Sequence, residues 1–384
     1  MSTDRVGASV MDGLVLTDHH CHGVAPAALD RAGFEALATE SSWPPPAGTS
    51  TFDSQLGFAI RRWCAPLLDL EPHADPEDYL ARRRELGPAE VNRRLLRAAG
   101  IGTFLVDTGC RPEELTTPKE TAELAGGEAR EVVRLEHVAE RVAAKGTEPP
   151  SFAADFAEAL AEAARSAAGL KSVAAYRCGL DFDPSPPSAR DVERAAARWL
   201  GDEARAAGTA PRLEDPVLVR HLLWTAVELG KPLQFHTGYG DPDADLLRCN
   251  PLHLAGWLRA TRGTGVPMML LHCYPYHREA GYLAQAFPQV YVDVGLAVNH
   301  TGARSAAVIA ESLELTPFHK ALFSTDALGL PELHYLGAVL FRRGFGRAAA
   351  RWINDGEWSR RDAERVAGLI GFRNAARVYG LEGP

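Results

Sequence analysis

The chain has 384 residues, 46% of them hydrophobic and 24% charged, with a formal net charge of −9 at pH 7. This composition is that of a globular protein, and the length fits one large α/β domain. The negative charge argues against nucleic acid as a partner. No run of about 18 apolar residues and no N-terminal signal pattern occur, so we expect no membrane segment. The six cysteines form no CxxC pair, which suits a reducing, cytoplasmic compartment.

Short apolar runs alternate with amphipathic Ala-, Glu- and Arg-rich segments along the chain. Buried, non-alternating runs of this kind are typical of parallel strands, and eight βα units predict a (β/α)8 TIM barrel. The expected strands are Leu14–Thr17, Thr103–Val106, Val132–Leu135, Ser172–Tyr176, Pro232–Phe235, Met268–Leu271, Val290–Val294 and Leu322–Ser324. Clear helical segments between them are Phe152–Ala168, Ala189–Ala207 and Pro216–Leu229.

About 80 residues separate the first two expected strands, far more than a βα loop needs. We expect a single domain, residues 1–384, with a helical cap inserted at about residues 28–98. The alternative is that this inserted segment lies at the periphery of the domain and has no role in function. Extra C-terminal helices are expected at Leu333–Arg343, Gly346–Asn354 and Ser359–Tyr379. The last of these begins with Ser359 and Asp362, which resemble a capping box.

Two histidines one residue apart, His20 and His22, follow the first apolar run. Side chains at positions i and i+2 of a strand point to the same face, so both imidazoles could converge on one metal ion. By the same alternation His19 and Cys21 should point away from that ion. Taken alone, the pattern also fits a polar strand end.

Further metal-ligand types stand at the ends of later strands. They are Lys171 in the fourth, His236 after the fifth, His272 after the sixth and Asp326 after the eighth. In a parallel barrel all strand carboxyl ends open on one face, so these residues should meet. Imidazole and carboxylate suit a divalent metal, with zinc favoured and manganese or iron as alternatives.

The order HxH, Lys, His, His, Asp on eight βα units resembles the amidohydrolase superfamily, in its amidohydrolase-2 branch. The chain is similar to the amidohydrolase domains that FluG-type and nodulin/glutamine-synthetase-type proteins carry beside a glutamine-synthetase-like domain. The stretches that carry the likeness are GLKSVAAYRCGL (169–180), PLQFHTGYGDPDADLLRCNPLHL (232–254), LLHCYPYHREAGYL (270–283), QVYVDVGLAV (289–298) and LFSTDALGLPELHYLG (322–337). No synthetase-like domain is expected here.

The resemblance implies that His20 and His22 bind a first metal, with Asp326 as its further ligand and proton shuttle. His236 and His272 would bind a second ion, bridged to the first by a carboxylated Lys171. In the competing view His20, His22, His236 and Asp326 hold a single ion. His272 then polarises the substrate carbonyl, and Lys171 forms an internal ion pair. Both views stay open at this point.

The implied reaction is hydrolysis of an amide or similar C–N bond by water that the metal activates, with Asp326 moving the proton. Arg177 and Tyr176 end the fourth strand, where a guanidinium could clamp a substrate carboxylate. Glu136 ends the third strand and could recognise an ammonium group or bind metal. The alternative is that Arg177, Tyr176 and Glu136 pack in a loop or behind the site and do not contact the substrate. His277, His300 and His334 lie near strand ends and would line either the pocket or the surface.

Three functions are compatible with these residues. The first is a metal-dependent amidohydrolase acting on a small carboxylated molecule such as a γ-glutamyl amide. The second is a non-oxidative, metal-dependent decarboxylase of an aromatic or enoic acid, which the same branch also contains. The third is a non-catalytic interaction module in nitrogen metabolism. We expect a cytoplasmic homo-oligomer with a small-molecule substrate and with neither nucleic acid nor membrane as a partner.

Overall fold

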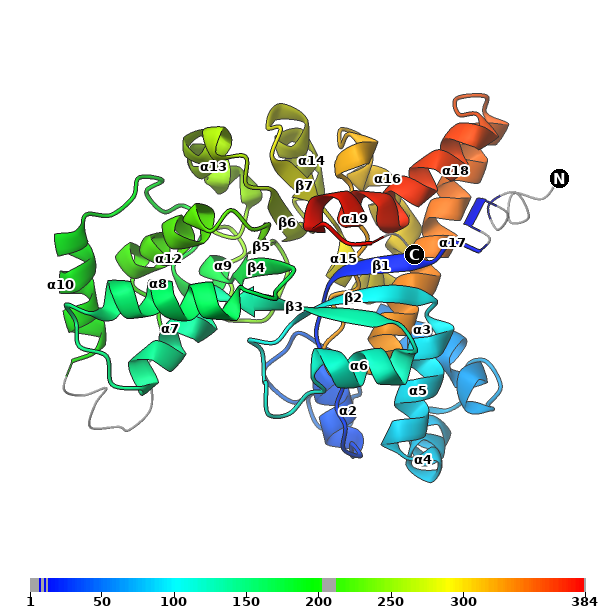
Figure 1. The fold of residues 1–384 in the computed structure, drawn as a ribbon. Helices are drawn as coiled ribbons and strands as arrows, with labels where there is room; N and C mark the ends of the chain where they lie inside the picture. Colours follow the sequence, from blue (N-terminus) through cyan, green and yellow to red (C-terminus); the bar gives the residue numbers. More distant parts are fainter. Residues whose placement is uncertain (1–6, 8–9, 12, 202–211, 383–384) are drawn as a thin grey trace.

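The computed structural model describes residues 7, 10, 11, 13–201 and 212–382. Seven parallel strands form one sheet in the order β1-β2-β3-β4-β5-β6-β7, each paired with its neighbour in sequence. The sheet is curled, and helices cover its outer side in a TIM-barrel-like arrangement (Figure 1). The strands are β1 (Leu16–Cys21), β2 (Ile101–Asp107), β3 (Glu128–Arg134), β4 (Gly169–Ser172), β5 (Leu233–Thr237), β6 (Met268–His272) and β7 (Val290–Val292). The expected parallel α/β architecture is therefore present.

The expected eighth strand, Leu322–Ser324, is not a regular strand in the structure. Its segment nevertheless lies between β7 and β1. Leu322 N donates to Val292 O at 2.9 Å, and Asp326 N donates to His20 O at 3.1 Å. The backbone turns into the left-handed region at Asp326, with φ of 49°, which prevents an extended ladder from continuing.

Two other strand ends differ from the expectation. The fourth strand ends at Ser172 and not at Tyr176, because the chain turns into the short helix α9 (Ala174–Arg177). The third strand ends at Arg134, so Glu136 belongs to the first turn of α7 (Leu135–Ala144). The Glu136 carboxylate accepts hydrogen bonds from Ser172 Oγ at 2.6 Å and from the backbone N–H of Val173 at 3.0 Å. These bonds satisfy backbone and hydroxyl donors at the point where β4 stops.

The segment between β1 and β2 is helical in the structure. It contains α2 (Arg31–Leu37), α3 (Gln55–Ala59), the π-helix η1 (Ile60–Cys64), the 3-10 helix η2 (Ala65–Leu68), α4 (Pro76–Leu86) and α5 (Pro88–Ala98). Buried Glu332 accepts from Tyr79 Oη at 2.8 Å and from Arg83 Nε at 2.6 Å. Because a buried carboxylate is costly unless it is paired, these bonds fix α4 against the C-terminal helix that carries Glu332.

The C-terminal helices are α17 (Pro331–Asn354), α18 (Arg360–Gly368), the π-helix η7 (Leu369–Arg373) and α19 (Asn374–Tyr379). The two helices expected within 333–354 are thus one. Ser359 Oγ accepts from Asp362 N at 3.0 Å, which confirms the predicted N-cap. None of the helices in the described part of the chain is both long enough and apolar enough to cross a bilayer.

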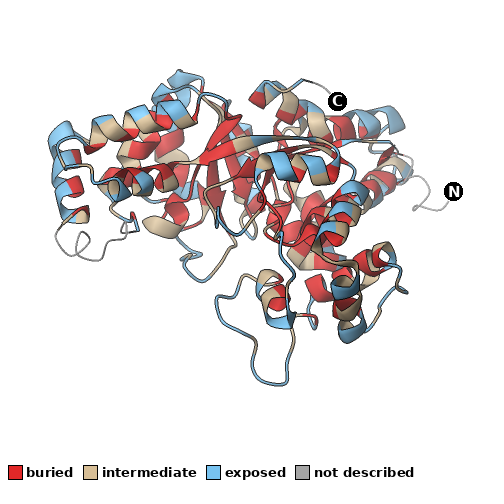
Figure 2. Ribbon diagram, turned by 60° about the horizontal axis from the view of Figure 1, so that its bottom comes forward, coloured by how far each residue is buried: buried red, intermediate tan, exposed pale blue. Residues whose placement is uncertain are grey.

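The other helices surround the sheet, and several of them are buried on one side and exposed to solvent on the other (Figure 2). They are α6 (Pro118–Ala125), α8 (Phe152–Ala163), α10 (Ala189–Trp199), α12 (Pro216–Glu228), α13 (Ala255–Thr261), α14 (His277–Ala286), α15 (Gly295–Thr301) and α16 (Ser305–Ser312). Helix α10 ends at Trp199, and part of the range expected for it, 202–207, lies outside the described residues.

A buried hydrogen-bond network links the last helix to the first strand. Tyr379 Oη lies 3.1 Å from His19 Nδ1 and accepts from Gln234 Nε2 at 2.8 Å. Gln234 Oε1 in turn lies 2.9 Å from His20 Nδ1. His19 and His20 therefore reach the same glutamine–tyrosine pair, which strict strand alternation does not allow. The cause is a register irregularity between Asp18 and Cys21 in the β1–β2 pairing.

We expect Tyr379→Phe to lower the free energy of unfolding by about 1–3 kcal/mol, because it leaves the buried His19 Nδ1 without its partner. Urea denaturation of the purified protein measures the change. Tyr282→Phe is the matched control, since that side chain is 52% exposed and should be near neutral. Equal stabilities of the two variants would contradict the role of this network.

Candidate metal centre

Three predicted ligands meet at the carboxyl end of β1. Asp326 Oδ1 lies 3.0 Å from His20 Nε2 and 3.6 Å from His22 Nε2. Their donor atoms all lie within 4.8 Å of one another. The His20 and His22 rings meet edge to face, with centroids 5.3 Å apart. One nitrogen of each ring and one carboxylate oxygen thus face a common point, as metal ligation requires.

The other ring nitrogen of each histidine is occupied, which fixes the tautomer. His20 Nδ1 donates to Gln234 Oε1 at 2.9 Å, and His22 Nδ1 donates to the carbonyl oxygen of Asp107 at 3.0 Å. Both Nε2 atoms therefore direct a lone pair towards the cluster. Partners of this kind orient metal-binding histidines and raise their basicity.

His236 and His272 complete the group from β5 and β6. Their ring centroids lie 4.6 Å apart, and His272 Nδ1 lies 3.3 Å from Asp326 Oδ2. His236 Nε2 and His272 Nδ1 are both buried, and neither makes a hydrogen bond within the described part of the chain. Unpartnered buried nitrogens are rare and point to a missing ion or water. These donors therefore fit a divalent metal.

Lys171 lies among these ligands on β4. Its Nζ atom donates to His20 Nε2 at 3.2 Å. Burial lowers the pKa of Lys171 to about 8, although the nearby Asp107 and Asp326 raise it. The neutral amine is therefore more accessible at neutral pH than in an exposed lysine.

Burial also keeps the histidines neutral. Burial and the charge of Lys171 lower the pKa of His20 to about 4. Burial lowers the pKa of His272 to about 3 and that of His236 well below the usual value. Burial alone would raise the pKa of Asp326, but His272, His20 and His22 hold it well below the usual range. Neutral imidazole and ionised carboxylate are the forms that bind metal.

A cavity of about 180 Å³ opens above these ligands. Predicted residues that line it are His22, Lys171, Tyr176, Arg177, His236, His272 and Asp326. Arg177 Nη1 pairs with Glu140 Oε1 at 2.9 Å, and Tyr176 packs on the His236 ring with centroids 4.2 Å apart. Glu136 is fully buried and is not among the described lining residues. The structure thus brings all six predicted metal ligands together, but not Glu136.

Several lining residues were not predicted from the sequence. They are Glu40, Cys110, Arg134, Arg212, Asp241 and Asp243. Arg134 donates to Asp107 Oδ2 through Nη2 at 2.6 Å, and Arg212 donates to the carbonyl oxygen of Tyr176 at 2.9 Å. Burial and the nearby Asp326 raise the pKa of Glu40 to about 8. Arg134 at the end of β3, and Asp241 and Asp243 in the loop after β5, are charged residues near strand ends, and this position was the sequence signal that they could lie near the site.

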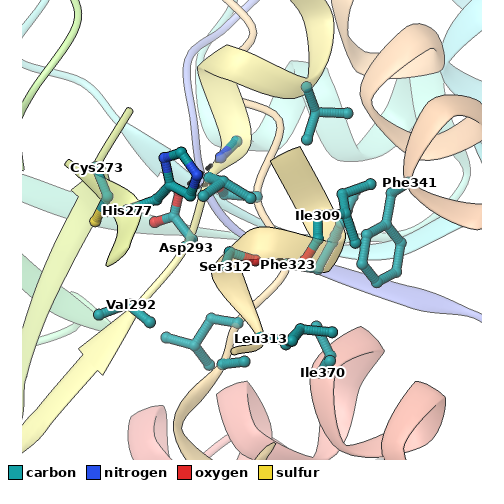
Figure 3. Close-up of a pocket in the computed structure, with 16 residues that line it drawn as sticks. Cys273, His277, Val292, Asp293, Ile309, Ser312, Leu313, Phe323, Phe341 and Ile370 are labelled. Atoms are coloured by element: carbon teal, nitrogen blue, oxygen red, sulfur yellow. Dashed lines mark hydrogen bonds between the residues drawn. The ribbon is translucent and has the colours of Figure 1, made fainter. Parts of the chain in front are cut away.

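The other histidines near strand ends lie outside this cavity's described lining. His277 Nε2 pairs with Glu311 Oε2 at 3.0 Å, His300 Nε2 lies 3.5 Å from Glu40 Oε1, and His334 is fully buried. His277 and Asp293 line a second, mostly apolar cavity on the outer side of β7 (Figure 3). Its volume of about 30 Å³ leaves space for a single water, so it is too small for a substrate.

The Amidohydrolase family model matches residues 128–381. The chain belongs to this family. It is 36% identical over 245 residues to Protein fluG of Emericella nidulans, a match that covers 60% of this chain. The matched region is only 28% of that relative's length.

Solved structures share the fold. A protein of Lactobacillus casei ATCC 334 described as a metal-dependent hydrolase is 28% identical, with a TM-score of 0.82 and coverage of 97% of each chain. A uronate isomerase of Thermotoga maritima is 13% identical, with a TM-score of 0.61, and the match covers 98% of this chain and 97% of the isomerase chain. The second likeness concerns the fold alone. Together with the family match, the first supports a metal-dependent hydrolase.

The lowered histidine pKa values predict that the chelator-treated protein loses stability as the pH falls from about 6.5 to about 4. In this window the unfolded chain binds protons at His20 and His272 that the folded chain does not. Between pH 7 and pH 5 each of them should cost about 1–2 kcal/mol of unfolding free energy. Urea titrations at the two pH values measure the loss. The His20→Gln variant should lose less, and an identical loss in both proteins would refute the explanation.

Proposed function

We propose that this protein is a metal-dependent hydrolase that cleaves an amide C–N bond of a small carboxylated substrate, specifically a γ-glutamyl amide. The observation that carries the proposal is the convergence of six ligand-type side chains, five of which line a cavity that three arginines also line. Two of the six carry a buried nitrogen that has no hydrogen-bond partner among the described residues. The proposal covers a single domain, residues 1–384, acting as a cytoplasmic homo-oligomer.

The cavity carries both signs of charge around the ligands. Arg177 and Arg212 supply guanidinium groups that could exchange their present carboxylate and carbonyl partners for a substrate carboxylate. Glu40 and Asp241 supply carboxyl groups whose pKa burial raises. A substrate ammonium group beside them would favour their ionised forms and pair with them. A γ-glutamyl group carries one carboxylate and one ammonium group on the same carbon atom, so it fits this pairing. Glu40 comes from the segment between β1 and β2, which supports that segment's role as a cap over the site.

A divalent metal, zinc by preference, would activate water and polarise the scissile carbonyl when bound at these ligands. The chain's own residues handle the proton. Asp326, ionised and with its side chain 12% exposed, accepts a proton from the attacking water and returns it to the leaving amine nitrogen. Gln234 and the Asp107 carbonyl hold His20 and His22 in the required tautomer throughout.

We further propose that Lys171 is carboxylated and bridges two ions. The ammonium group would first lose one proton, and the resulting neutral amine would attack CO2, forming an N–C bond and releasing a second proton. The cationic side chain would thereby become an anionic oxygen donor. Two observations support a position of the Lys171 side chain between the two histidine pairs. Its Nζ atom lies within hydrogen-bond distance of His20 Nε2, and its charge lowers the pKa of His236.

The substrate class is tested with a panel of γ-glutamyl amides and hydroxybenzoates, reading released amine against released CO2. We expect amine from the γ-glutamyl amides and no CO2. Release of CO2 without amine would establish the decarboxylase alternative and refute the hydrolase proposal.

Asp326→Asn should lower kcat by about 10²–10⁴-fold, because the amide cannot act as a general base. Steady-state kinetics on the substrate identified from the panel measures the loss, and circular dichroism checks the fold. Asp53→Asn, at an exposed position, is the matched control and should keep full activity. Near-normal kcat in Asp326→Asn would exclude it as the proton carrier.

Lys171→Met should abolish a carbamate carbon resonance that wild-type protein shows after exposure to ¹³C-labelled bicarbonate. It should also lower the bound metal by one ion per chain, because the bridging ligand is lost. NMR and elemental analysis give the two readouts. Absence of the resonance in wild type, together with unchanged metal content in the variant, would favour the single-ion arrangement.

A further inference from the structure

A second group of metal-ligand types lies next to the candidate centre and is separate from it. Asp18 and Cys21 on β1 and His334 on α17 place a carboxylate oxygen, a thiol sulfur and a ring nitrogen within 4.8 Å of one another. All three side chains are buried. Alternation turns Cys21 away from its neighbours His20 and His22, which face Asp326. The register irregularity between Asp18 and Cys21 accompanies the meeting of these two side chains in one group.

The His334 ring packs edge to face against Phe104, with centroids 5.7 Å apart, but this contact satisfies neither of its nitrogens. Its residue exposure is 0%, and neither Nδ1 nor Nε2 makes a hydrogen bond to the described residues. The nearest acid is Asp18, whose Oδ2 lies 3.8 Å from Nδ1, beyond hydrogen-bond distance. An unsatisfied buried nitrogen is unfavourable, so an imidazole with two of them calls for a ligand.

We propose that Asp18, Cys21 and His334 bind a second, structural transition-metal ion of the zinc class. Thiolate, imidazole and carboxylate are the donors that zinc takes. A tetrahedral ion with donors at about 2.0–2.3 Å spaces those donors roughly 3.3–3.8 Å apart. The 3.8 Å between Asp18 and His334 lies at the upper end of this range. All three donor atoms lie within 4.8 Å of one another, so an ion would draw them together by about 1 Å at most.

The charges also balance at this site. Binding displaces the thiol proton of Cys21 to solvent, so that one thiolate and one carboxylate neutralise the divalent ion. Asp18 keeps its other contacts, because Thr325 N donates to Oδ1 at 2.9 Å and Thr325 Oγ1 donates to Oδ2 at 2.5 Å. Thr325 directly precedes Asp326. The ion would therefore tie β1 and α17 to the segment that carries the proton shuttle.

Cobalt substitution distinguishes this site from the candidate catalytic centre. A thiolate bound to Co(II) gives an intense near-ultraviolet charge-transfer band. Among the described residues, no cysteine is one of the proposed ligands around Asp326, and Cys110, which lines the cavity there, is tested separately below. We expect the cobalt-loaded wild-type protein to show this band. Its absence would overturn the proposal without any bearing on hydrolase activity, because the readout does not involve substrate.

Variants and a structural readout complete the test. Cys21→Ser and His334→Gln should each lose the band and one metal ion per chain, measured by elemental analysis. Cys110→Ser and Cys64→Ser are the matched controls and should keep both, since neither thiol belongs to the group. A band that persists in Cys21→Ser, or that Cys110→Ser removes, contradicts the assignment. If the variants fail to fold, an anomalous-difference peak between Asp18 and His334 in cobalt-loaded wild-type crystals decides the question, and a water there in its place refutes it.

Discussion

The position of the Asp326 carboxylate is the constraint on which the rest of the site depends. One oxygen lies 3.0 Å from His20 Nε2 and the other lies 3.3 Å from His272 Nδ1, so a single side chain joins the two histidine pairs. Its backbone holds a left-handed conformation, with φ of 49°, that a non-glycine residue adopts only when its surroundings enforce it. The hydrogen bond from Asp326 N to His20 O, with the Thr325–Asp18 bonds beside it, supplies that enforcement.

Burial then sets the chemical state of the ligands. Histidines that stay neutral to about pH 4 compete poorly for protons and remain free to bind a cation. Burial of a histidine is unfavourable when the ring nitrogen that does not face the metal lacks a hydrogen-bond partner. In His20 this nitrogen is Nδ1, and its hydrogen bond to Gln234 supplies the partner. Gln234 also bonds Tyr379 on the last helix. The C-terminus of the described chain therefore supports a ligand on the first strand, which links stability to the metal centre.

Much of this arrangement was predictable from the sequence, because the ligand types follow apolar runs and parallel strands open on one face. His20, His22, Lys171, His236, His272 and Asp326 do meet. The errors concern the places where tertiary contacts override local pattern. The Glu136 carboxylate caps the end of β4, so the residues up to Tyr176 that looked like strand form a helical turn.

The remaining features depend on contacts between distant segments. His19 stays out of the cluster of His20, His22 and Asp326, as alternation predicted. Its contact with Tyr379, in the interior network that also holds His20, depends on the folded chain, and no local pattern signals it. Glu40 and Arg212 reach the cavity from a long insertion and from a loop, where side-chain direction follows only from the folded chain. His334 was expected to lie in the pocket or at the surface, and it lies in neither.

Anomalous diffraction from crystals of the metal-loaded protein tests the central claim most directly. The account predicts a strong peak at the metal's absorption edge within about 2.0–2.3 Å of His20 Nε2 and His22 Nε2, with Asp326 as a shared ligand. The Lys171 carbamate proposal adds a second peak beside His236 and His272. An empty site in fully loaded crystals, or metal bound only at surface residues, would contradict the account.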